Sequence, residues 1–506
     1  MRKTRRKILL AIGSLIGLAI GFVAVEHWRG ARALAKWEAA MHAKGEKLTI
    51  RELTPSVPPG VNGAGDFQSN ATHLPRLGRV LLTSLPGVIR ILPSGRAVSL
   101  LQYTNWPERG YVRSGGTNRL GPSDLAADVA KGGRALASVH AALRQPVLDF
   151  GINYERGYRA NWLYRRPLKE TAHWLRGAAL DAVYRREFDA AVTNLEAIAI
   201  LAQTLIREPL LTSQTNRIAI ETTGIGALWE VLPAVGWSDP QLARLQAAWQ
   251  FDGGLAALRR ALPMDSAMAA DVIDHRSTNG LRGEFGVFGT LCCDDRVLAE
   301  ARDAVANFTG QWLVYPFWSA AWADQDRLHL GRHLRAWEDG LRELEPYPGI
   351  VQLANLDRAI SRKFVIETAY DRARFRVSAL RAPERTFRAA TEVLENETLR
   401  RMAVAAIALE RHRLRHSQYP EALMALVPEF LPGLPMDFMD GQPLRYRLKP
   451  DGHFALWSVG RNGTDEGGSV RPVFTDELGL NDRRDLVWPE PATPEEIADA
   501  EAKRQR

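Results

Sequence analysis

Two histidine-containing groups have the residue types and spacing that metal or acid–base chemistry needs. In DVIDHRS, Asp271 and His275 are four residues apart and would meet on one face of a helix. In HRLRH, His412 and His416 have the same spacing, but Arg413 stands where the zinc-protease pattern requires Glu. Neither group has an identifiable third ligand or nucleophile, so we interpret both as polar contacts on helix surfaces.

An aromatic segment offers a second kind of chemistry. The stretch FTGQWLVYPFWSAAW contains Trp312, Tyr315, Trp318 and Trp322. Such side chains contact sugars or peptides when they line a groove, but at helical spacing they also build cores. The sequence leaves both alternatives open, and a groove for cell-wall glycan would be sought here.

The familiar catalytic motifs are absent from the sequence, which contains no Gly-x-Ser-x-Gly elbow, nucleotide-binding fingerprint or paired zinc motif. The only cysteines, Cys292 and Cys293, are adjacent, which disfavours a structural disulfide and leaves no further thiol to complete a metal site. Their redox state stays open. Paired glycosidase carboxylates need not be close in sequence, so a hydrolase remains the alternative to a protein without catalytic activity.

The net charge of +8 lies at the two ends of the chain. Five positive charges stand in residues 1–7 and three in residues 503–506. Because these eight equal the whole net charge, the residues between them sum to zero. No basic field remains there to attract nucleic acid, so the sequence excludes a nucleic-acid partner.

The elements that must position these groups begin with an uncharged run, Ile8 to Val25. As a helix this run would be about 27 Å long, which matches the hydrocarbon core of a bilayer. The basic tail of residues 1–7 predicts a cytoplasmic N-terminus, with the bulk of the chain in the periplasm. A cleaved signal peptide is the alternative, but the one fitting cleavage site, Ala31-Arg32-Ala33, lies well past the run. We therefore predict a single-pass inner-membrane protein whose transmembrane helix spans residues 8–25.

Glycines within this run predict self-association of the anchor. Gly13, Gly17 and Gly21 are four residues apart, so they share one helix face on which two anchors can approach closely. The segment GFVAVE, which begins at Gly21, also matches a type IV prepilin cleavage site. A prepilin has its apolar helix after the cut, whereas here the apolar run precedes Gly21, so we predict that the chain is not cut there.

The rest of the chain divides by composition into a mainly helical architecture. Residues 26–48 are predicted to form a juxtamembrane amphipathic helix, and residues 49–122 an irregular region rich in proline and glycine. Residues 123–395 form a multi-helix body. Within it, the small residues and short turn of residues 173–209 resemble one tetratricopeptide-type hairpin, with a generic pair of antiparallel helices as the alternative.

The C-terminal segment, residues 396–488, is predicted to be a small α+β domain. It begins with a helix and a Tyr419-Pro420 turn. Two alternating strands, PLRYRL and HFALWSVG, then flank a hairpin turn made by Lys449-Pro450-Asp451-Gly452. Residues 489–506 are predicted to be a flexible tail.

This order of elements resembles the C-terminal region of the type II secretion major pseudopilin. The matching residues are Tyr419, Pro420, Leu423, Leu426, Pro435, Asp437, Gly441, Tyr446, Ser458, Gly460, Gly463, Gly467, Gly468, Asp485 and Trp488. The resemblance covers about 90 of the 506 residues. The whole chain resembles long membrane-anchored proteins of planctomycete-like bacteria, which end in similar segments. An association with a secretion or pilus-like system follows by fold analogy.

The pseudopilin resemblance also implies a calcium site. In that family the final loop binds calcium through aspartate side chains and carbonyl groups. Here Asn462 stands where the family has Asp, and Phe438 where it has Pro. Asp465, Glu466 and Asp485 remain as oxygen ligands, with a metal-free glycine-rich loop as the alternative. No other cofactor is predicted.

Together these features predict an envelope protein with a binding or scaffolding role outside the inner membrane. Its partners would be the lipid bilayer, a second copy of its anchor, and envelope or secretion proteins. The alternative is a membrane-tethered hydrolase acting on cell-wall glycan or peptide. A buried carboxylate pair facing the aromatic segment would favour the hydrolase.

Overall fold

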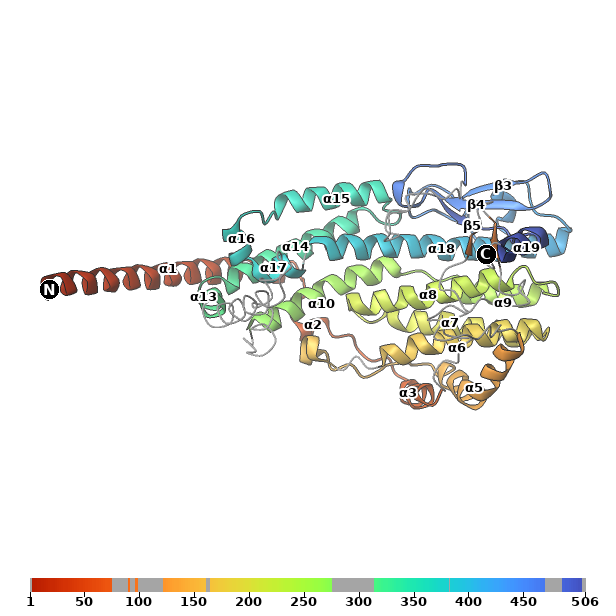
Figure 1. The fold of residues 1–506 in the computed structure, drawn as a ribbon, viewed down its shortest axis with the longest axis horizontal. Helices are drawn as coiled ribbons and strands as arrows, with labels where there is room; N and C mark the ends of the chain where they lie inside the picture. Colours follow the sequence, from red (N-terminus) through yellow and green to blue (C-terminus); the bar gives the residue numbers. More distant parts are fainter. Residues whose placement is uncertain are drawn as a thin grey trace.

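A single helix of 42 residues, α1 (Arg2–Ala43), runs from the N-terminus into the body of the molecule (Figure 1). The computed structural model describes residues 2–74, 90–91, 96–98, 122–160, 164–274, 314–381, 383–468 and 485–502, and it is mainly helical, as predicted. Leu15 in the first half of α1 is 73% exposed, whereas Leu34 in the second half is buried. The predicted transmembrane and juxtamembrane helices are one element, because no proline interrupts residues 2–43.

Two helices among the described residues are long and apolar enough to cross a membrane, namely Arg6–Ala43 and Phe188–Ile206. The most apolar window of the first is 0% buried inside the body, whereas half of that of the second is buried. The second helix is α7, whose Leu195 and Ile198 are fully buried in the core. It is therefore a core helix, and the predicted apolar anchor helix lies at the N-terminus.

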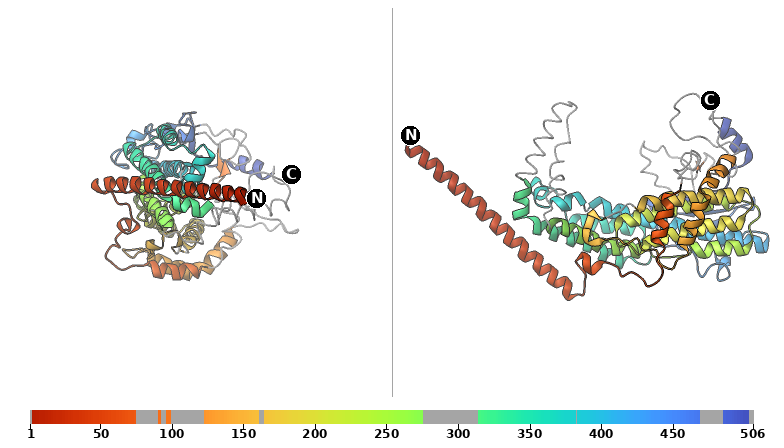
Figure 2. Two further views of the ribbon diagram at one scale, coloured as in Figure 1. Left: turned by 90° about the vertical axis from the view of Figure 1, so that its left-hand side faces the viewer. Right: turned by 90° about the horizontal axis from the view of Figure 1, so that it is seen from below.

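Helix α14 (Ala323–Glu343) holds the second half of α1 against the body. A Cβ atom on Gly331 would lie 2.8 Å from the Trp37 ring, so a glycine is needed where α14 and α1 touch. The Gln325 side-chain amide donates to the Glu26 carbonyl at 2.8 Å. These contacts fix the direction in which α1 leaves the body, which is oblique to its long axis (Figure 2).

The helical body consists of long helices that lie side by side along the length of the molecule (Figure 1). The bounds of its helices are α2 (Ile50–Leu53), α3 (Ala64–Thr72), α5 (Pro122–Leu143), α6 (Arg165–Tyr184), α7 (Phe188–Ile206), α8 (Leu211–Val231), α9 (Asp239–Trp249), α10 (Gly254–Asp274), α13 (Tyr315–Ala321), α15 (Ile350–Lys363), α16 (Ala369–Arg374) and α17 (Arg376–Arg381).

Helices α6 and α7 form the predicted helical hairpin. Ala179 on α6 and Ala191 and Ala202 on α7 are fully buried, and such small side chains let two helices approach closely. Helix α8 packs on both. The antiparallel pair is confirmed, while the finer likeness to a tetratricopeptide unit stays a prediction.

Two stretches of the multi-helix body with helical periodicity are divided into shorter helices. The stretch 242–262 is broken between α9 and α10 at Gly253, whose φ of +124° lies in the region that favours glycine. The stretch 356–380 forms α15, α16 and α17, and Thr368 begins α16 with a capping box to Asp371. Apolar periodicity therefore located these segments but not their breaks.

The C-terminal part contains the predicted hairpin. Strands β3 (Arg445–Leu448), β4 (Phe454–Ser458) and β5 (Leu486–Trp488) form an antiparallel sheet in that order. The turn closes through a hydrogen bond from the Lys449 N–H to the His453 carbonyl at 2.7 Å. The preceding helix, α18 (Pro383–His416), is continuous, so the boundary predicted between residues 395 and 396 falls inside it.

The segment expected to be a flexible tail is structured over its described residues. The Ala97 N–H of strand β2 (Ala97–Val98), which pairs with β1 (Arg90–Ile91), donates to the Glu490 carbonyl at 2.7 Å. Ala492 N–H returns a bond to the Ala97 carbonyl at the same distance. Residues Pro494–Ala502 then form α19. The backbone of the segment thus has partners that the sequence did not reveal.

Helix α18 passes through two separate apolar cores. Val393 and Leu394 belong to the proximal core, which α10, α13, α14 and α15 share on the side of the body near α1. Residues 402–409 belong to the distal core, which α5 to α9 share with the C-terminal sheet. Between these two groups, α18 buries a set of polar side chains: Asn396, Glu397, Thr398 and Arg400.

A buried ionic cluster, here called the polar belt, lies at this boundary. It consists of Arg217, Glu221, Glu397 and Arg400, each at most 2% exposed. Arg217 bonds Glu221, and Arg400 bonds Glu397. Glu397 also accepts from the Gly254 N–H at 3.1 Å, so the belt ties α8, α10 and α18 together. Burial raises the pKa of Glu221, which is the cost of removing this carboxyl from water.

Candidate functional site

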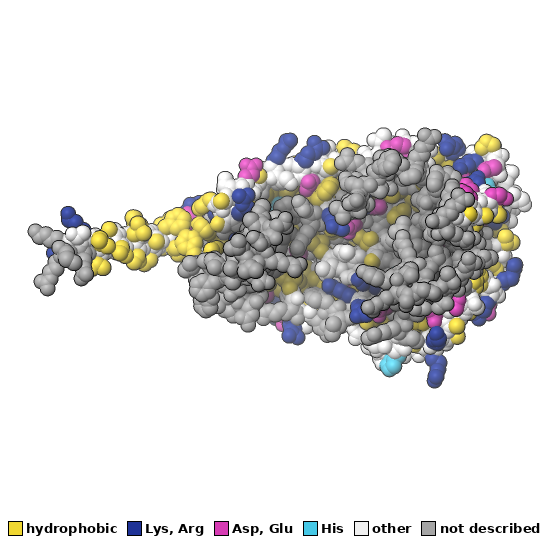
Figure 3. Space-filling view, in the orientation of Figure 1, with side chains coloured by type: hydrophobic (Ala, Val, Ile, Leu, Met, Phe, Trp, Pro, Cys, Tyr) yellow, Lys and Arg dark blue, Asp and Glu magenta, His cyan; other side chains and the backbone are white. Residues whose placement is uncertain are grey.

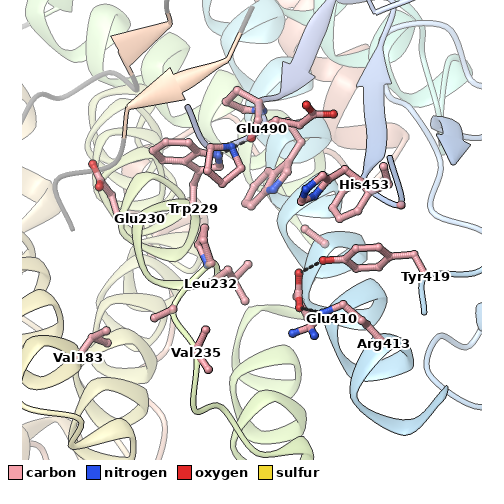
Figure 4. A pocket seen from close by; sticks show the side chains of 18 of the residues that line it. Val183, Trp229, Glu230, Leu232, Val235, Glu410, Arg413, Tyr419, His453 and Glu490 are labelled. Carbon is pink, nitrogen blue, oxygen red and sulfur yellow. Dashed lines mark hydrogen bonds and ion pairs between the residues drawn. The ribbon is translucent and has the colours of Figure 1, made fainter. Parts of the chain in front are cut away.

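A cavity, here called the distal pocket, lies where α8, α18 and the C-terminal sheet meet. Its volume is about 860 Å³, within the range of pockets that hold small ligands. Figure 4 shows Leu232 and Val235 on one side and Glu410, Tyr419 and His453 on the other. Its walls are mostly apolar, and the apolar lining residues include Val183, Phe188, Trp229, Ala234, Ala406, Phe454 and Trp488.

A hydrogen-bonded group at the C-terminal end of α18 and in the turn after it forms the polar side of the distal pocket. The Tyr419 hydroxyl donates to Glu410 at 2.5 Å, and the Arg413 Nε donates to the other oxygen of this carboxylate at 2.8 Å. Burial, and then the charge of Glu410, raise the pKa of Tyr419. The phenol therefore keeps its proton, and the carboxylate is held by two donors.

The remaining acidic side chains that line the pocket also have basic neighbours. Glu490 pairs with Lys449 and with Arg96, the latter at 3.3 Å. Buried Glu230 lies 3.5 Å from the Arg176 guanidinium. A hydrogen bond from the His453 N–H lowers the pKa of Asp451. Because each of these carboxylates already has a partner within the protein, the lining is suited to binding.

Trp229 forms part of the wall of the distal pocket opposite Glu410 and Tyr419. The Trp229 Nε1 donates to the Pro489 carbonyl at 2.8 Å, which attaches α8 to the segment after β5. This bond orients the indole, and its satisfied N–H leaves the ring as an apolar surface. The pocket is thus preformed by contacts between distant parts of the chain.

The aromatic segment has a different role from the predicted groove. Trp312 lies outside the described residues. Tyr315, Trp318 and Trp322 are buried, with 5%, 1% and 7% of their surface exposed, so these three do not line an open groove. They belong to the proximal core.

The end of this segment instead packs on the anchor helix. Phe317 stacks on Phe22 of α1 at 6.3 Å between ring centroids, and Trp322 lies edge-on to Phe317 at 4.8 Å. Phe317 and Tyr370 remain 36% and 48% exposed. This group, here called the aromatic collar, surrounds the point at which the exposed part of α1 meets the body. Figure 3 shows apolar side chains continuing from α1 onto this end of the molecule.

One buried carboxylate faces the aromatic segment. Asp326 is fully buried and accepts hydrogen bonds from Trp318 Nε1 (3.2 Å), Val377 N–H (2.7 Å) and the Ser378 N–H and hydroxyl. Burial raises its pKa to about 6, against these bonds. All of its donors come from the protein, so Asp326 joins α13, α14 and α17 and lacks the open partner that a hydrolase would need.

The acidic loop brings Asp465, Glu466 and Asp485 together. Asp485 accepts from the Glu466 and Gly468 N–H groups at 3.1 Å and 2.7 Å, and Asp465 accepts from Trp457 Nε1 at 2.9 Å. No group of three metal-ligating side chains is arranged to hold a metal ion among the described residues. Calcium binding here stays a prediction of the resemblance.

The nearby Asp437 connects several segments of the C-terminal part through its hydrogen bonds. It is fully buried and accepts from Ser458 Oγ at 2.9 Å, Met439 N–H at 2.8 Å and Val459 N–H at 3.1 Å. Arg445 completes its partners at 3.1 Å and also bonds Asp440. This arginine places a positive charge among carboxylates of the C-terminal part.

The other residues singled out from sequence do not form a second site within the described chain. The His412 and His416 rings are 4.3 Å apart, and His412 bonds the Gln418 carbonyl at 2.9 Å. His275, Cys292 and Cys293 lie outside the described residues. On the anchor, a Cβ on Gly13, Gly17 or Gly21 would meet nothing within 4 Å, so the predicted contact face is open.

Sequence reasoning missed the distal pocket because its lining comes from separate segments. Tyr419 was noted only for its turn, and Glu410 only as part of a helix. The spacing of nine residues between them, across the end of α18, was the available local signal. Comparison of the chain with protein-family models, with curated proteins and with solved structures found no match.

Proposed function

We propose that this chain is a single-pass membrane protein with a binding role in the cell envelope, and that its ligand occupies the distal pocket. The observation that carries the proposal is a preformed, mostly apolar pocket whose acidic groups already have partners. Such a lining favours a largely apolar ligand with a few hydrogen-bonding groups, such as a peptide segment.

The anchoring part of the proposal is supported by α1. Residues 8–22 of its uncharged run are exposed, and its second half is packed on α14, so the same helix would join bilayer and body. We infer that the N-terminus is cytoplasmic and that the body is periplasmic, because the basic residues precede the apolar run. A periplasmic reporter fused after Lys44 is expected to be active, and activity only from a cytoplasmic reporter would reverse the topology.

Binding has more support than hydrolysis of cell-wall glycan or peptide. The carboxylates of the distal pocket are held by basic side chains, a hydroxyl or a backbone N–H, and Asp326 is saturated by protein donors. A scaffolding role beside a secretion or pilus-like system rests on the pseudopilin resemblance alone.

The binding proposal can be tested by what purifies with the intact protein from its own membranes. Val235 lines the pocket but is 84% exposed, so Val235→Trp narrows the pocket without disturbing a core. Val61→Trp is the matched control, because Val61 is 66% exposed and does not line the pocket. Mass spectrometry of bound molecules is expected to find a species with the wild type and control that is depleted in Val235→Trp.

Both variants should melt at the wild-type temperature, since exposed substitutions change stability little. An identical set of bound molecules in all three proteins would exclude a ligand in the distal pocket. Muropeptide fragments released as cleaved products would favour the hydrolase instead.

A further inference from the structure

A second cavity, here called the proximal pocket, lies beside the anchor helix. It has a volume of about 710 Å³ and is bounded by α1, α14, the end of α15 and α16. Trp37 forms part of its wall on α1, and Phe364 and Phe375 form part of the opposite wall. His329 of α14 stacks on Phe375 at 4.3 Å between ring centroids.

Basic side chains dominate the charge of this pocket. Its lining contains five arginine or lysine residues and one acidic residue. That acid, Asp339, pairs with Arg335 at 3.1 Å. Within the described part of the chain, Arg332 and Lys363 have no ion pair with a carboxylate, and the Arg374 Nε donates to the neutral Gln325 amide oxygen at 2.6 Å. Three cationic groups are therefore available to an anion from outside the chain.

The position of the pocket along α1 identifies the source of that anion. Arg29 lies four residues beyond Val25, about 6 Å along the helix, and the polar headgroup layer is about 5–7 Å thick on each side of a bilayer. Gln325 bonds the Glu26 carbonyl and accepts from Arg374, which brings Arg374 to the same level. The exposed aromatic collar lies on the bilayer side of this level, where aromatic side chains favour the interface.

We propose that the proximal pocket binds the headgroup of an anionic phospholipid from the leaflet on which the body sits. The phosphate binds at Arg374. Arg332 and Lys363 attract it electrostatically from the side farther from the bilayer, since Gly331 beside Arg332 packs on Trp37, deeper in the body than Glu26. The lipid thereby fixes the orientation of the body on the membrane. This inference rests on the anchoring part of the proposed function, and it assigns a lipid specificity that anchoring alone does not require.

The test uses the full chain in nanodiscs that contain equal amounts of phosphatidylglycerol and phosphatidylcholine. Native mass spectrometry of the released protein measures the ratio of the two lipids that stay bound. The wild type is expected to retain phosphatidylglycerol selectively. The double variant Arg332→Gln/Lys363→Gln is expected to lower this selectivity roughly tenfold or more, since each basic residue near an anionic surface contributes a several-fold preference.

The matched control is Arg362→Gln/Arg372→Gln, which removes the same charge from α15 and α16, two segments that border the pocket, but does not touch the pocket lining. It is expected to keep the wild-type selectivity. Equal loss in both double variants would overturn the site in favour of diffuse attraction. The melting temperature of detergent-solubilised protein is measured with phosphatidylglycerol and with inorganic phosphate. If phosphate alone raises it as much as the lipid does, the site binds a free anion and the lipid proposal is overturned. Recovery of the wild type outside the membrane fraction would instead refute the anchoring itself.

Discussion

The distal and proximal pockets have similar volumes and linings of opposite net charge. The distal pocket is lined by four acidic and two basic side chains, the proximal pocket by one acidic and five basic side chains. In the distal pocket the acidic groups have partners within the protein, such as Tyr419 and Arg413 for Glu410. In the proximal pocket Arg332 and Lys363 have no such carboxylate partner in the described chain. A lining that is internally paired suits a neutral ligand, whereas unpaired cations suit an external anion.

The apolar cores near these two pockets also differ in the helices that build them. The distal core is built largely from alanine and leucine on α6 to α8, which lets helices pack closely. Both cores contain buried tryptophans, but the proximal core is the one that packs on α1, through Val23. The polar belt lies between the two cores and joins them through α8, α10 and α18.

Among the changes proposed here, breaking the polar belt should lower the free energy of unfolding the most. Glu397→Ala leaves Arg217 and Arg400 buried with Glu221 as their remaining carboxylate, and removing one partner of a buried ion pair typically costs about 3–5 kcal/mol. Thermal and denaturant unfolding in detergent should show this loss. Glu392→Ala on the same helix removes an exposed pair with Arg388 and should cost below about 1 kcal/mol. Similar losses for both variants would show that the belt does not couple the cores.

Acidification should weaken the proximal core through its two histidines. Burial lowers the pKa of His329 and of His333 to about 4. The pKa of each histidine is lower in the folded than in the unfolded protein, so protonation favours the unfolded state. The free energy of unfolding is therefore fully present above about pH 6.5 and falls as the pH approaches 4, with about 1 kcal/mol per histidine lost at about pH 5.5. The raised pKa of Asp326 acts in the opposite direction and offsets part of the loss.

The double variant His329→Gln/His333→Gln isolates this contribution. Its melting temperature should fall less than that of the wild type between about pH 7.5 and 5.5. The exposed His73→Gln variant is the control and should follow the wild type. An unchanged acid response in the double variant would assign the effect to other groups.

Disrupting the contact between α1 and α14 should lower the free energy of unfolding less than breaking the polar belt does. Gly331→Leu places side-chain atoms where the Trp37 ring lies, and overpacking of this kind costs about 1–3 kcal/mol. Gly21→Leu meets nothing within 4 Å and should leave the unfolding of the body unchanged. If the three anchor glycines pair two copies, Gly21→Leu should instead reduce crosslinked dimer in membranes. Equal unfolding curves for Gly331→Leu and the wild type would contradict the clamp between α14 and α1.

Calcium should have the smallest effect, and only on the distal end. With a dissociation constant near 1 mM, typical of weak extracellular sites, 1 mM calcium would add about 0.4 kcal/mol. Melting curves with calcium and with a chelator should therefore almost coincide, and Asp485→Asn should abolish any difference. A large calcium-dependent shift would mean that Asp465, Glu466 and Asp485 rearrange into a strong site.

Local patterns in the sequence were sufficient for several elements. The uncharged run predicted the exposed first half of α1, and the Lys449–Gly452 turn between alternating strands predicted the β3–β4 hairpin. The small residues of α6 and α7 predicted their close packing. Each of these features depends on residues that are near one another in the chain, which is why periodicity and turn chemistry find them.

Tertiary structure alone decided the functional surfaces. The polar belt pairs residues of α8 and α18 that are far apart in sequence, and the distal pocket combines Leu232, Glu410, His453 and Trp488. The aromatic segment had a composition compatible with a groove, but Tyr315, Trp318 and Trp322 are buried in the proximal core where α13 packs on α1 and α14. Charge pairing and burial depend on which helix faces meet across long loops. The free energy of such contacts cannot be deduced from local periodicity.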